Sequence, residues 1–287
     1  MLISQAIISL YDRFTHGAMS RRDFMERLAK LAGGSAAAVA VLPMLQNDYA
    51  QAAIIAEDDE RLAIDELTYN AGGADVSGYL VRLKGGEKRP AVVVIHENRG
   101  LNPHIKDVAR RLAMEGFLVL APDMLSPVGG TPGDADKARD MIRALDSETT
   151  TVQLAAAVPA LAAQTESTGK VGAVGFCWGG GMVNELAVRV GTLGAGVAYY
   201  GRQVDAPRVA AIRAPLMLHY AGLDERINAG ITNYEAALKQ AEKAYRIYVY
   251  DGVNHAFNND TNAARYDQAA AELAWGRTVG FFKEKLA

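Results

Sequence analysis

The sequence predicts an α/β fold, with a mostly parallel central sheet and helices on both faces. From residue 62 onward, short apolar runs alternate with segments whose apolar residues recur at helical spacing. The run at 91–95 (AVVVI) is apolar throughout and rich in β-branched residues. Such a run is typical of a central strand that is buried on both faces. These observations predict one α/β domain over residues 53–287.

The expected elements follow one another closely along this domain. Residues 64–69 and 77–83 should form an opening antiparallel pair, and the later strands are expected at 91–95, 117–120, 171–174, 195–199, 216–220 and 245–250. Helices are expected at 105–114, 135–145, 152–163, 180–190, 231–241 and 262–285. Ligands of such sheets bind at the carboxyl ends of the strands, so the loops after strands are the places to look for chemistry.

Composition narrows the class of protein. The chain has 287 residues, of which 50% are hydrophobic and 22% charged, as in an ordinary globular protein. The formal net charge is −3 without a long basic block, which argues against a nucleic-acid partner. No uninterrupted apolar stretch reaches 18 residues, so a stable membrane span is not expected. The single cysteine excludes an intramolecular disulfide.

Residues 1–52 have the features of a twin-arginine signal peptide. Arg21, Arg22 and Phe24 precede an uncharged stretch rich in Ala and Gly at 31–45. The triplet at 50–52 (AQA) has the small residues that signal peptidase accepts. We therefore expect export by the twin-arginine machinery to the periplasm or beyond, with a mature chain that starts near Ala53. The alternatives are an amphipathic N-terminal helix that packs on the domain, or a tail on a protein that stays in the cytoplasm.

The string Gly175-Phe176-Cys177-Trp178-Gly179 lies between an expected strand and an expected helix. This is the context of the nucleophile elbow G-x-S-x-G, with Cys in place of Ser. The turn needs glycines because side chains at the flanking positions would collide with the backbone. A lone cysteine is otherwise most often a buried apolar residue. The elbow instead predicts Cys177 as a nucleophile, with the backbone N–H of Trp178 as an oxyanion donor.

A nucleophile on such an elbow is followed in the chain by an acid and then a histidine. Of the five histidines, His255 alone follows the last expected strand and lies in a turn-rich loop. The acid should lie in the loop after the preceding strand, where Asp224 and Glu225 are adjacent. We favour Asp224 because its shorter side chain is held more rigidly against an imidazole, and Glu225 is the alternative.

The loop at 96–100 (HENRG) follows the run at 91–95 and carries further candidates. A backbone N–H here, that of Asn98, would complete the oxyanion hole. Glu97 either pairs with Arg99 as a structural contact or reaches the thiol and tunes it. The residues alone leave these two roles open.

These segments resemble the dienelactone hydrolase family (carboxymethylenebutenolidases) of the α/β-hydrolase superfamily. The shared strings are HENRG at 96–100, APD at 121–123, GFCWGG at 175–180, YYG at 199–201, the Gly222-x-Asp224 loop and HAF at 255–257. The resemblance implies a Cys177–His255–Asp224 triad, a Glu97 that regulates thiolate formation, and an acyl-enzyme formed without metal or cofactor. It makes Arg99, Tyr200 and Asn259 candidates for binding a small ester or lactone.

One position departs from the family pattern. Members that open dienelactone hold the substrate carboxylate with arginines, and one of these follows the catalytic histidine by four residues, where this chain has Asn259. We therefore expect neutral esters or lactones to be preferred over anionic ones. Arg139 and Arg202 lie in regions that correspond loosely to the other arginines.

Other functions use the same residues or none of them. Thioester hydrolysis or acyl transfer would need the same triad, whereas a binding protein on a hydrolase fold would need no triad at all. A zinc hydrolase is not expected, since no two histidines have the spacing of a helix face or a zinc finger. Oligomeric state cannot be read from the sequence.

Overall fold

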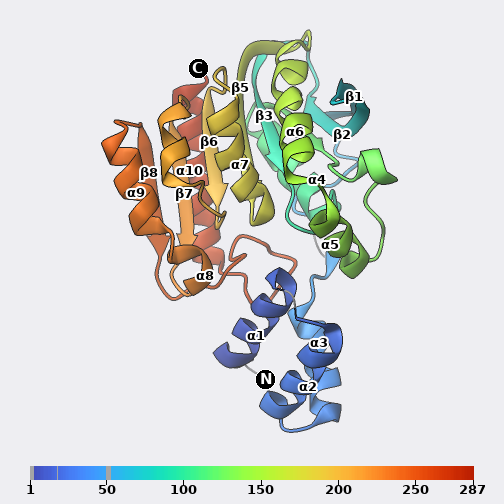
Figure 1. The fold of residues 1–287 in the computed structure, drawn as a ribbon. Coiled ribbons are helices and arrows are strands. Elements are labelled where there is room, and N and C mark those ends of the chain that lie inside the picture. Colours follow the sequence, from blue (N-terminus) through green and yellow to red (C-terminus); the bar gives the residue numbers. More distant parts are fainter. Residues whose placement is uncertain (1–2, 18, 50–52) are drawn as a thin grey trace.

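The computed structural model describes residues 3–17, 19–49 and 53–287, and it contains one eight-stranded sheet (Figure 1). The strand order is β1-β2-β4-β3-β5-β6-β7-β8. Strand β2 runs antiparallel to both of its neighbours, and all the other pairs are parallel. The strands are β1 (Leu62–Ala71), β2 (Ala74–Leu83), β3 (Arg89–Ile95), β4 (Leu118–Pro122), β5 (Ser167–Phe176), β6 (Ala195–Tyr199), β7 (Leu216–Ala221) and β8 (Tyr245–Tyr250).

Helices cover both faces of the sheet and divide the core into two layers. One layer packs α4 (Pro103–Met114) and α10 (Gln268–Lys285) against the sheet. The other packs α6 (Ser147–Ala162), α7 (Trp178–Arg189) and α9 (Ile231–Gln240) against the opposite face. Strand β3 contributes to both layers, because Val92 and Val94 point to the first and Val93 and Ile95 to the second. Two further α-helices of the described residues from 53 onward are α5 (Ala135–Ala144) and α8 (Glu225–Asn228).

The predicted fold class is therefore confirmed, including the opening antiparallel pair. The largest shift concerns the last helix, which was expected from residue 262 and begins at Gln268. Asp267 caps it by accepting a hydrogen bond from the N–H of Ala270. Residues 255–267 instead form a series of turns, in which Asn259 and Asn262 are fully buried and hydrogen-bonded. Asparagine stabilises turns by such local bonds, and this favours loop over helix here.

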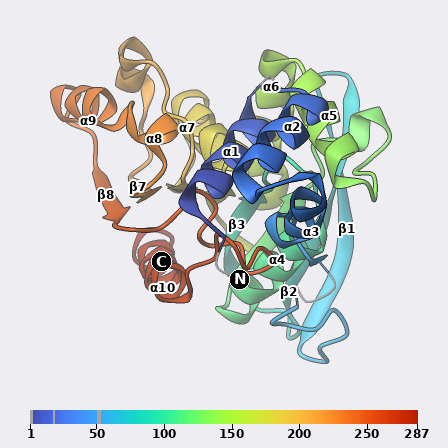
Figure 2. The same cartoon turned by 90° about the horizontal axis from the view of Figure 1, so that it is seen from below.

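The described residues 3–17 and 19–49 fold into three helices, α1 (Gln5–His16), α2 (Arg21–Ala32) and α3 (Ser35–Leu45). Their apolar faces form a small core of their own, in which Phe14 stacks on Phe24 at a ring distance of 4.4 Å. Figures 1 and 2 show this bundle lying across the carboxyl ends of the strands, with α1 closest to the sheet. We call residues 3–49 the N-terminal bundle. It occupies the side of the sheet on which the site was expected.

The N-terminal bundle is fastened to the α/β domain by polar contacts at several points. Gln5 bonds to Asn254 at 2.6 Å, and Arg21 pairs with Asp136 at 2.7 Å. Asn262 donates to the backbone carbonyl of Leu45 at 2.6 Å. This arrangement is the packed N-terminal segment that the sequence left open as the alternative to a signal peptide. The triplet at 50–52, where cleavage was expected, lies outside the described residues.

Arg21 and Arg22 stand at the start of α2, and both side chains are more than half exposed. Across the described ranges, no single helix is long and apolar enough to cross a membrane. Helices α2 and α3 pass the test of length and composition only when taken together, and they meet at a bend of 107°. A signal sequence near the N-terminus passes the same test.

Candidate active site

Cys177 lies on a sharp turn between β5 and α7, with φ 56° and ψ −112°. The neighbouring glycines permit this turn. A Cβ at Gly175 would lie 2.1 Å from the carbonyl oxygen of Gly179, and a Cβ at Gly179 would lie 2.3 Å from that of Ile95. Both distances are far below van der Waals contact. The turn holds the Cys177 side chain at the carboxyl end of the sheet and at the first turn of α7.

His255 lies in the loop after β8, and its ring is oriented by Asp224 from the loop after β7. The Nδ1 atom of His255 is 2.5 Å from Oδ2 of Asp224, and both side chains are buried. The other ring nitrogen, Nε2, is buried and has no hydrogen-bond partner among the described residues. Glu225, the alternative acid, is exposed, so the structure brings Asp224 and not Glu225 to the histidine.

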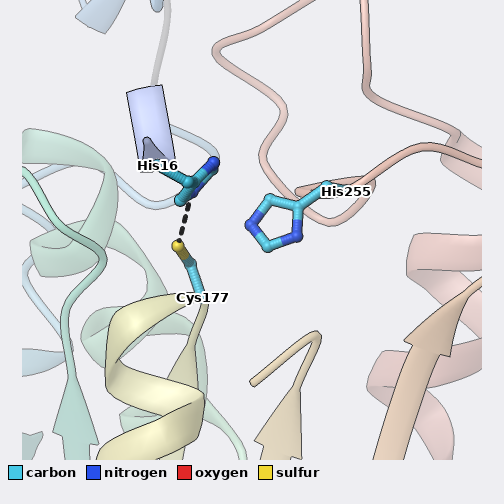
Figure 3. A group of neighbouring side chains, drawn as sticks. All are labelled: His16, Cys177 and His255. Atoms are coloured by element: carbon cyan, nitrogen blue, oxygen red, sulfur yellow. Dashed lines mark hydrogen bonds between the residues drawn. The ribbon is translucent and has the colours of Figure 1, made fainter. Parts of the chain in front are cut away.

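A second histidine contacts the thiol, and sequence reasoning missed it. His16, the last residue of α1, places its Nε2 3.1 Å from Sγ of Cys177. Figure 3 shows this bond and the ring of His255 beside it. The ring centroids of His16 and His255 are 4.6 Å apart. Nδ1 of His16 lies 3.0 Å from Oδ1 of Asp12, one helical turn earlier. The spacing of Asp12 and His16 on one helix face was the available signal, but His16 had been assigned to a signal peptide.

The charges around the thiol favour an ion pair. Burial alone raises the pKa of the Cys177 thiol, but the positive charges of His16 and His255 outweigh this and lower it to about 6. Burial lowers the pKa of His255, and the carboxylate of Asp224 with the Cys177 thiolate more than reverses this, to about 10. The pKa of His16 is likewise raised against the effect of burial, first by the thiolate of Cys177. These charges favour the thiolate form of Cys177 near neutral pH.

Two backbone N–H groups were predicted to bind a developing oxyanion. Those of Asn98 and Trp178 make no hydrogen bond within the described part of the chain. The Trp178 ring is held by stacking on the buried ring of His96 at 5.2 Å. The side chain of Asn98 donates to the backbone carbonyl of Thr15 at 3.1 Å, so α1 also braces this loop.

Glu97 has a hydrogen-bond partner that neither of the two roles considered for it includes. Glu97 accepts a hydrogen bond from Nδ2 of Asn259 at 2.7 Å, and no direct bond joins it to the Cys177 thiol. Arg99 pairs with Asp136 at 3.4 Å and donates to Tyr11 at 3.3 Å. Glu97 and Arg99 both line a small cavity beside Cys177. The buried side chain of Asn259 thus fixes the carboxylate of Glu97 through this hydrogen bond.

A cleft of about 540 Å³ opens over Cys177 and His255. Tyr200 lines it in a left-handed backbone conformation, with φ 39°, and its ring lies 4.8 Å from that of His255. Asn259 does not line the cleft, so its assignment as a substrate-binding residue is not supported by its position. The cleft wall is instead rich in arginine, with Arg139, Arg143, Arg202, Arg208 and Arg226 beside the acidic Glu185 and Asp205.

The donor atoms of His16, Cys177 and His255 all lie within 4.8 Å of one another. By distance alone, an ion could contact all three. These residues come from three distant segments, which is why no spacing in the sequence reveals the group. Two of these atoms, Nε2 of His16 and Sγ of Cys177, already share a hydrogen bond with each other.

Known proteins share both parts of this chain. The sequence profile of the "Dienelactone hydrolase family" matches residues 76–286, and that of "YqhI-like" matches residues 3–34. The chain is 47% identical over 112 residues to a hydrolase fragment named YghX of Escherichia coli (strain K12), covering 38% of this chain and 96% of the fragment. It is 30% identical over 254 residues to a protein of Saccharolobus solfataricus named as a carboxymethylenebutenolidase, covering 76% and 97% of the two chains.

A solved structure has the same fold. The dienelactone hydrolase-like promiscuous phosphotriesterase P91 from metagenomic libraries superposes with a TM-score of 0.71 at 26% identity, covering 79% of this chain and all of the other. The family profile spans most of the α/β domain and includes the elbow and the loops that carry Asp224 and His255. The chain belongs to the dienelactone hydrolase family, and it is a hydrolase that acts on esters or lactones.

Proposed function

We propose that the protein hydrolyses small carboxylic esters or lactones through an acyl-enzyme on Cys177. The observation that carries this proposal is a buried thiol on a strained elbow, with the Asp224–His255 pair beside it. The thiolate attacks the carbonyl carbon, and the N–H groups of Asn98 and Trp178 stabilise the oxyanion. The imidazolium of His255 then protonates the departing alcohol.

The second half of the reaction regenerates the enzyme. Neutral His255 takes a proton from water, and the resulting hydroxide attacks the acyl carbon. The bond from carbon to sulfur breaks, so that the acid leaves and the thiolate returns. Asp224 stabilises the imidazolium through its bond to Nδ1.

Mixing the enzyme with an excess of an activated aryl ester tests this mechanism. We expect a burst of one alcohol per active site, because acylation of a thiolate is fast, and loss of all turnover after alkylation of Cys177. Mass spectrometry of the quenched burst should show the acyl group on the peptide that contains Cys177. Turnover that survives full alkylation would contradict the proposal.

The arginine-rich cleft bears on substrate charge. Arg139 pairs with Asp136 and Asp140, whereas Arg202 forms no ion pair with any described residue. We propose that Arg202 admits anionic lactones, which replaces the expectation drawn from Asn259. In Arg202→Met, kcat/KM for an anionic lactone should fall several-fold relative to a neutral one, since an exposed charge pair contributes about 1 kcal/mol. Thioester hydrolysis is the alternative activity. Measuring kcat/KM of the wild type for acyl-thioesters beside lactones and esters distinguishes it from ester hydrolysis. If Arg202→Met leaves the ratio of kcat/KM for the anionic and neutral lactones unchanged, Arg202 does not bind the substrate's negative charge.

Export by the twin-arginine machinery is a further proposal, supported by the exposed Arg21 and Arg22 ahead of an uncharged segment. That machinery carries folded proteins, so a folded N-terminal bundle is compatible with it. Cells producing the native chain and a variant with Arg21→Lys and Arg22→Lys should differ, with periplasmic protein only in the first. If both chains stay in the cytoplasm, the segment does not direct export.

A further inference from the structure

The N-terminal bundle brings a second pair of aspartate and histidine to the same sulfur. Oδ1 of Asp12 lies 3.0 Å from Nδ1 of His16, as Asp224 lies against Nδ1 of His255, and the donor atoms of both histidines lie within 4.8 Å of the sulfur of Cys177. A carboxylate on Nδ1 fixes the tautomer and stabilises the imidazolium. Two such pairs from opposite ends of the chain converge on one thiol. His16 lies outside the region that the hydrolase family profile matches.

The two histidines have different contacts, and these suit them to different steps of the reaction. Both histidines line the cleft, but His16 makes a direct hydrogen bond to the sulfur at 3.1 Å, whereas Nε2 of His255 has no hydrogen-bond partner among the described residues. A histidine engaged by the sulfur is suited to hold its charge. One whose Nε2 has no partner is suited to exchange protons with the alcohol and with water.

Building on the proposed ester hydrolysis, we propose that His16 is a second catalytic histidine, which takes the proton of the Cys177 thiol and holds the thiolate as an ion pair. The proton moves from Sγ to Nε2 of His16 and stays there while the sulfur–carbon bond forms and later breaks. His255 gives one proton to the leaving alcohol and regains one from water. Protons therefore balance over the cycle, and His16 needs no exchange with solvent.

The placement of His16 depends on the packing of α1. Thr15 accepts a hydrogen bond from Asn98, Arg143 donates to the carbonyl of Gly17 at 2.6 Å, and Arg226 lies 3.5 Å from Asp12. These contacts fix the end of α1 over the elbow. The charged and titratable groups around the thiol come from α1 and from the segments that follow four strands, and they are Asp12, His16, Glu97, Arg99, Tyr200, Asp224, Arg226, His255 and Arg265.

The pH dependence of Cys177 alkylation by iodoacetamide tests the proposal in the full-length chain, with EDTA present. The wild-type rate should rise with a midpoint near pH 6. His16→Gln keeps a polar side chain but cannot carry a proton, so its midpoint should move up by at least one pH unit. A shift of one unit, from 6 to 7, lowers the thiolate fraction at pH 6 about fivefold. Asp12→Asn should shift the midpoint in the same direction by less. Arg27→Gln, which removes an exposed charge from α2 in the same bundle, should leave the midpoint unchanged.

The pH dependence of kcat/KM for ester hydrolysis is the second measurement. The loss of kcat/KM in His16→Gln should shrink as pH rises toward 9, because hydroxide then replaces the missing base. A lowered melting temperature with an unchanged alkylation midpoint would show that His16 only packs, and would overturn the proposal. So would a midpoint shift that appears only when zinc replaces EDTA. If the wild type hydrolyses no ester and yet His16→Gln shifts the midpoint, ester hydrolysis fails while the ion pair stands.

Discussion

Cys177→Ala is expected to lower kcat for ester hydrolysis at least about 10³-fold, because removing the nucleophile of a triad disables the whole unit. The fold should survive this change. Alanine keeps the Cβ that cysteine already places at φ 56°, so no new backbone strain arises. It also removes a buried charge, and active-site groups of this kind commonly cost stability. The melting temperature should stay within about 4 °C of wild type or rise, a shift of about 1 kcal/mol for a chain of this size.

Gly175→Ala provides the contrasting control. Its new Cβ would meet the carbonyl of Gly179 at 2.1 Å, so the elbow itself must move. Activity and melting temperature should then fall together, whereas Cys177→Ala separates them. Retention of more than a few per cent of kcat in Cys177→Ala would contradict the assignment of the nucleophile.

The fold was predictable because its signals are local. The apolar run of β3 and the helical spacing of α4 and α7 each follow from residues that are close in sequence. The turns at 255–267 were harder, since Asn262 is fixed by the carbonyl of Leu45, more than 200 residues away. A helical pattern cannot report a competing bond to a distant segment.

The residues of the site also fall into those that local sequence signals predict and those that depend on distant contacts. The elbow and the loops of Asp224 and His255 follow strands, and parallel strands bring their carboxyl ends to one edge of the sheet. His16 belongs to no such loop and reaches the thiol only because α1 folds back over that edge. The direction of the Asn259 side chain could not be predicted either. Its distance from His255 in sequence says nothing about the direction of its side chain, which points to Glu97.

The position of His16 also ties the chemistry to the N-terminus. Cleavage near Ala53 would remove His16 together with Asp12, and His255 would be the only histidine left near the thiol among the described residues. A chain that is exported and cleaved and a chain that keeps its bundle would therefore differ in thiol reactivity at neutral pH. The alkylation midpoint distinguishes these two forms of the protein.

Asp224→Asn is expected to lower kcat about 10³-fold or more, since in Ser-His-Asp hydrolases the same change lowers it about 10⁴-fold. Two roles of Asp224 can be separated by this variant. Oδ1 caps α8 by accepting from the N–H of Ile227 at 3.2 Å, and an asparagine oxygen can keep that bond. Oδ2 bonds to Nδ1 of His255, where an amide N–H would force the proton onto Nε2 and block its function as a base.

Thiol reactivity should respond far less than turnover in Asp224→Asn, because His16 still holds the thiolate through its bond at 3.1 Å. Alkylation of Cys177 at neutral pH should therefore continue while hydrolysis stops. Glu225→Gln is the matched control, since it neutralises the adjacent, exposed carboxylate and should leave both rates unchanged. Steady-state hydrolysis, iodoacetamide kinetics and thermal unfolding on the same samples measure all three quantities. Equal losses of alkylation and hydrolysis in Asp224→Asn would mean that His255 alone sets the thiolate, and near-normal hydrolysis would exclude Asp224 from the triad.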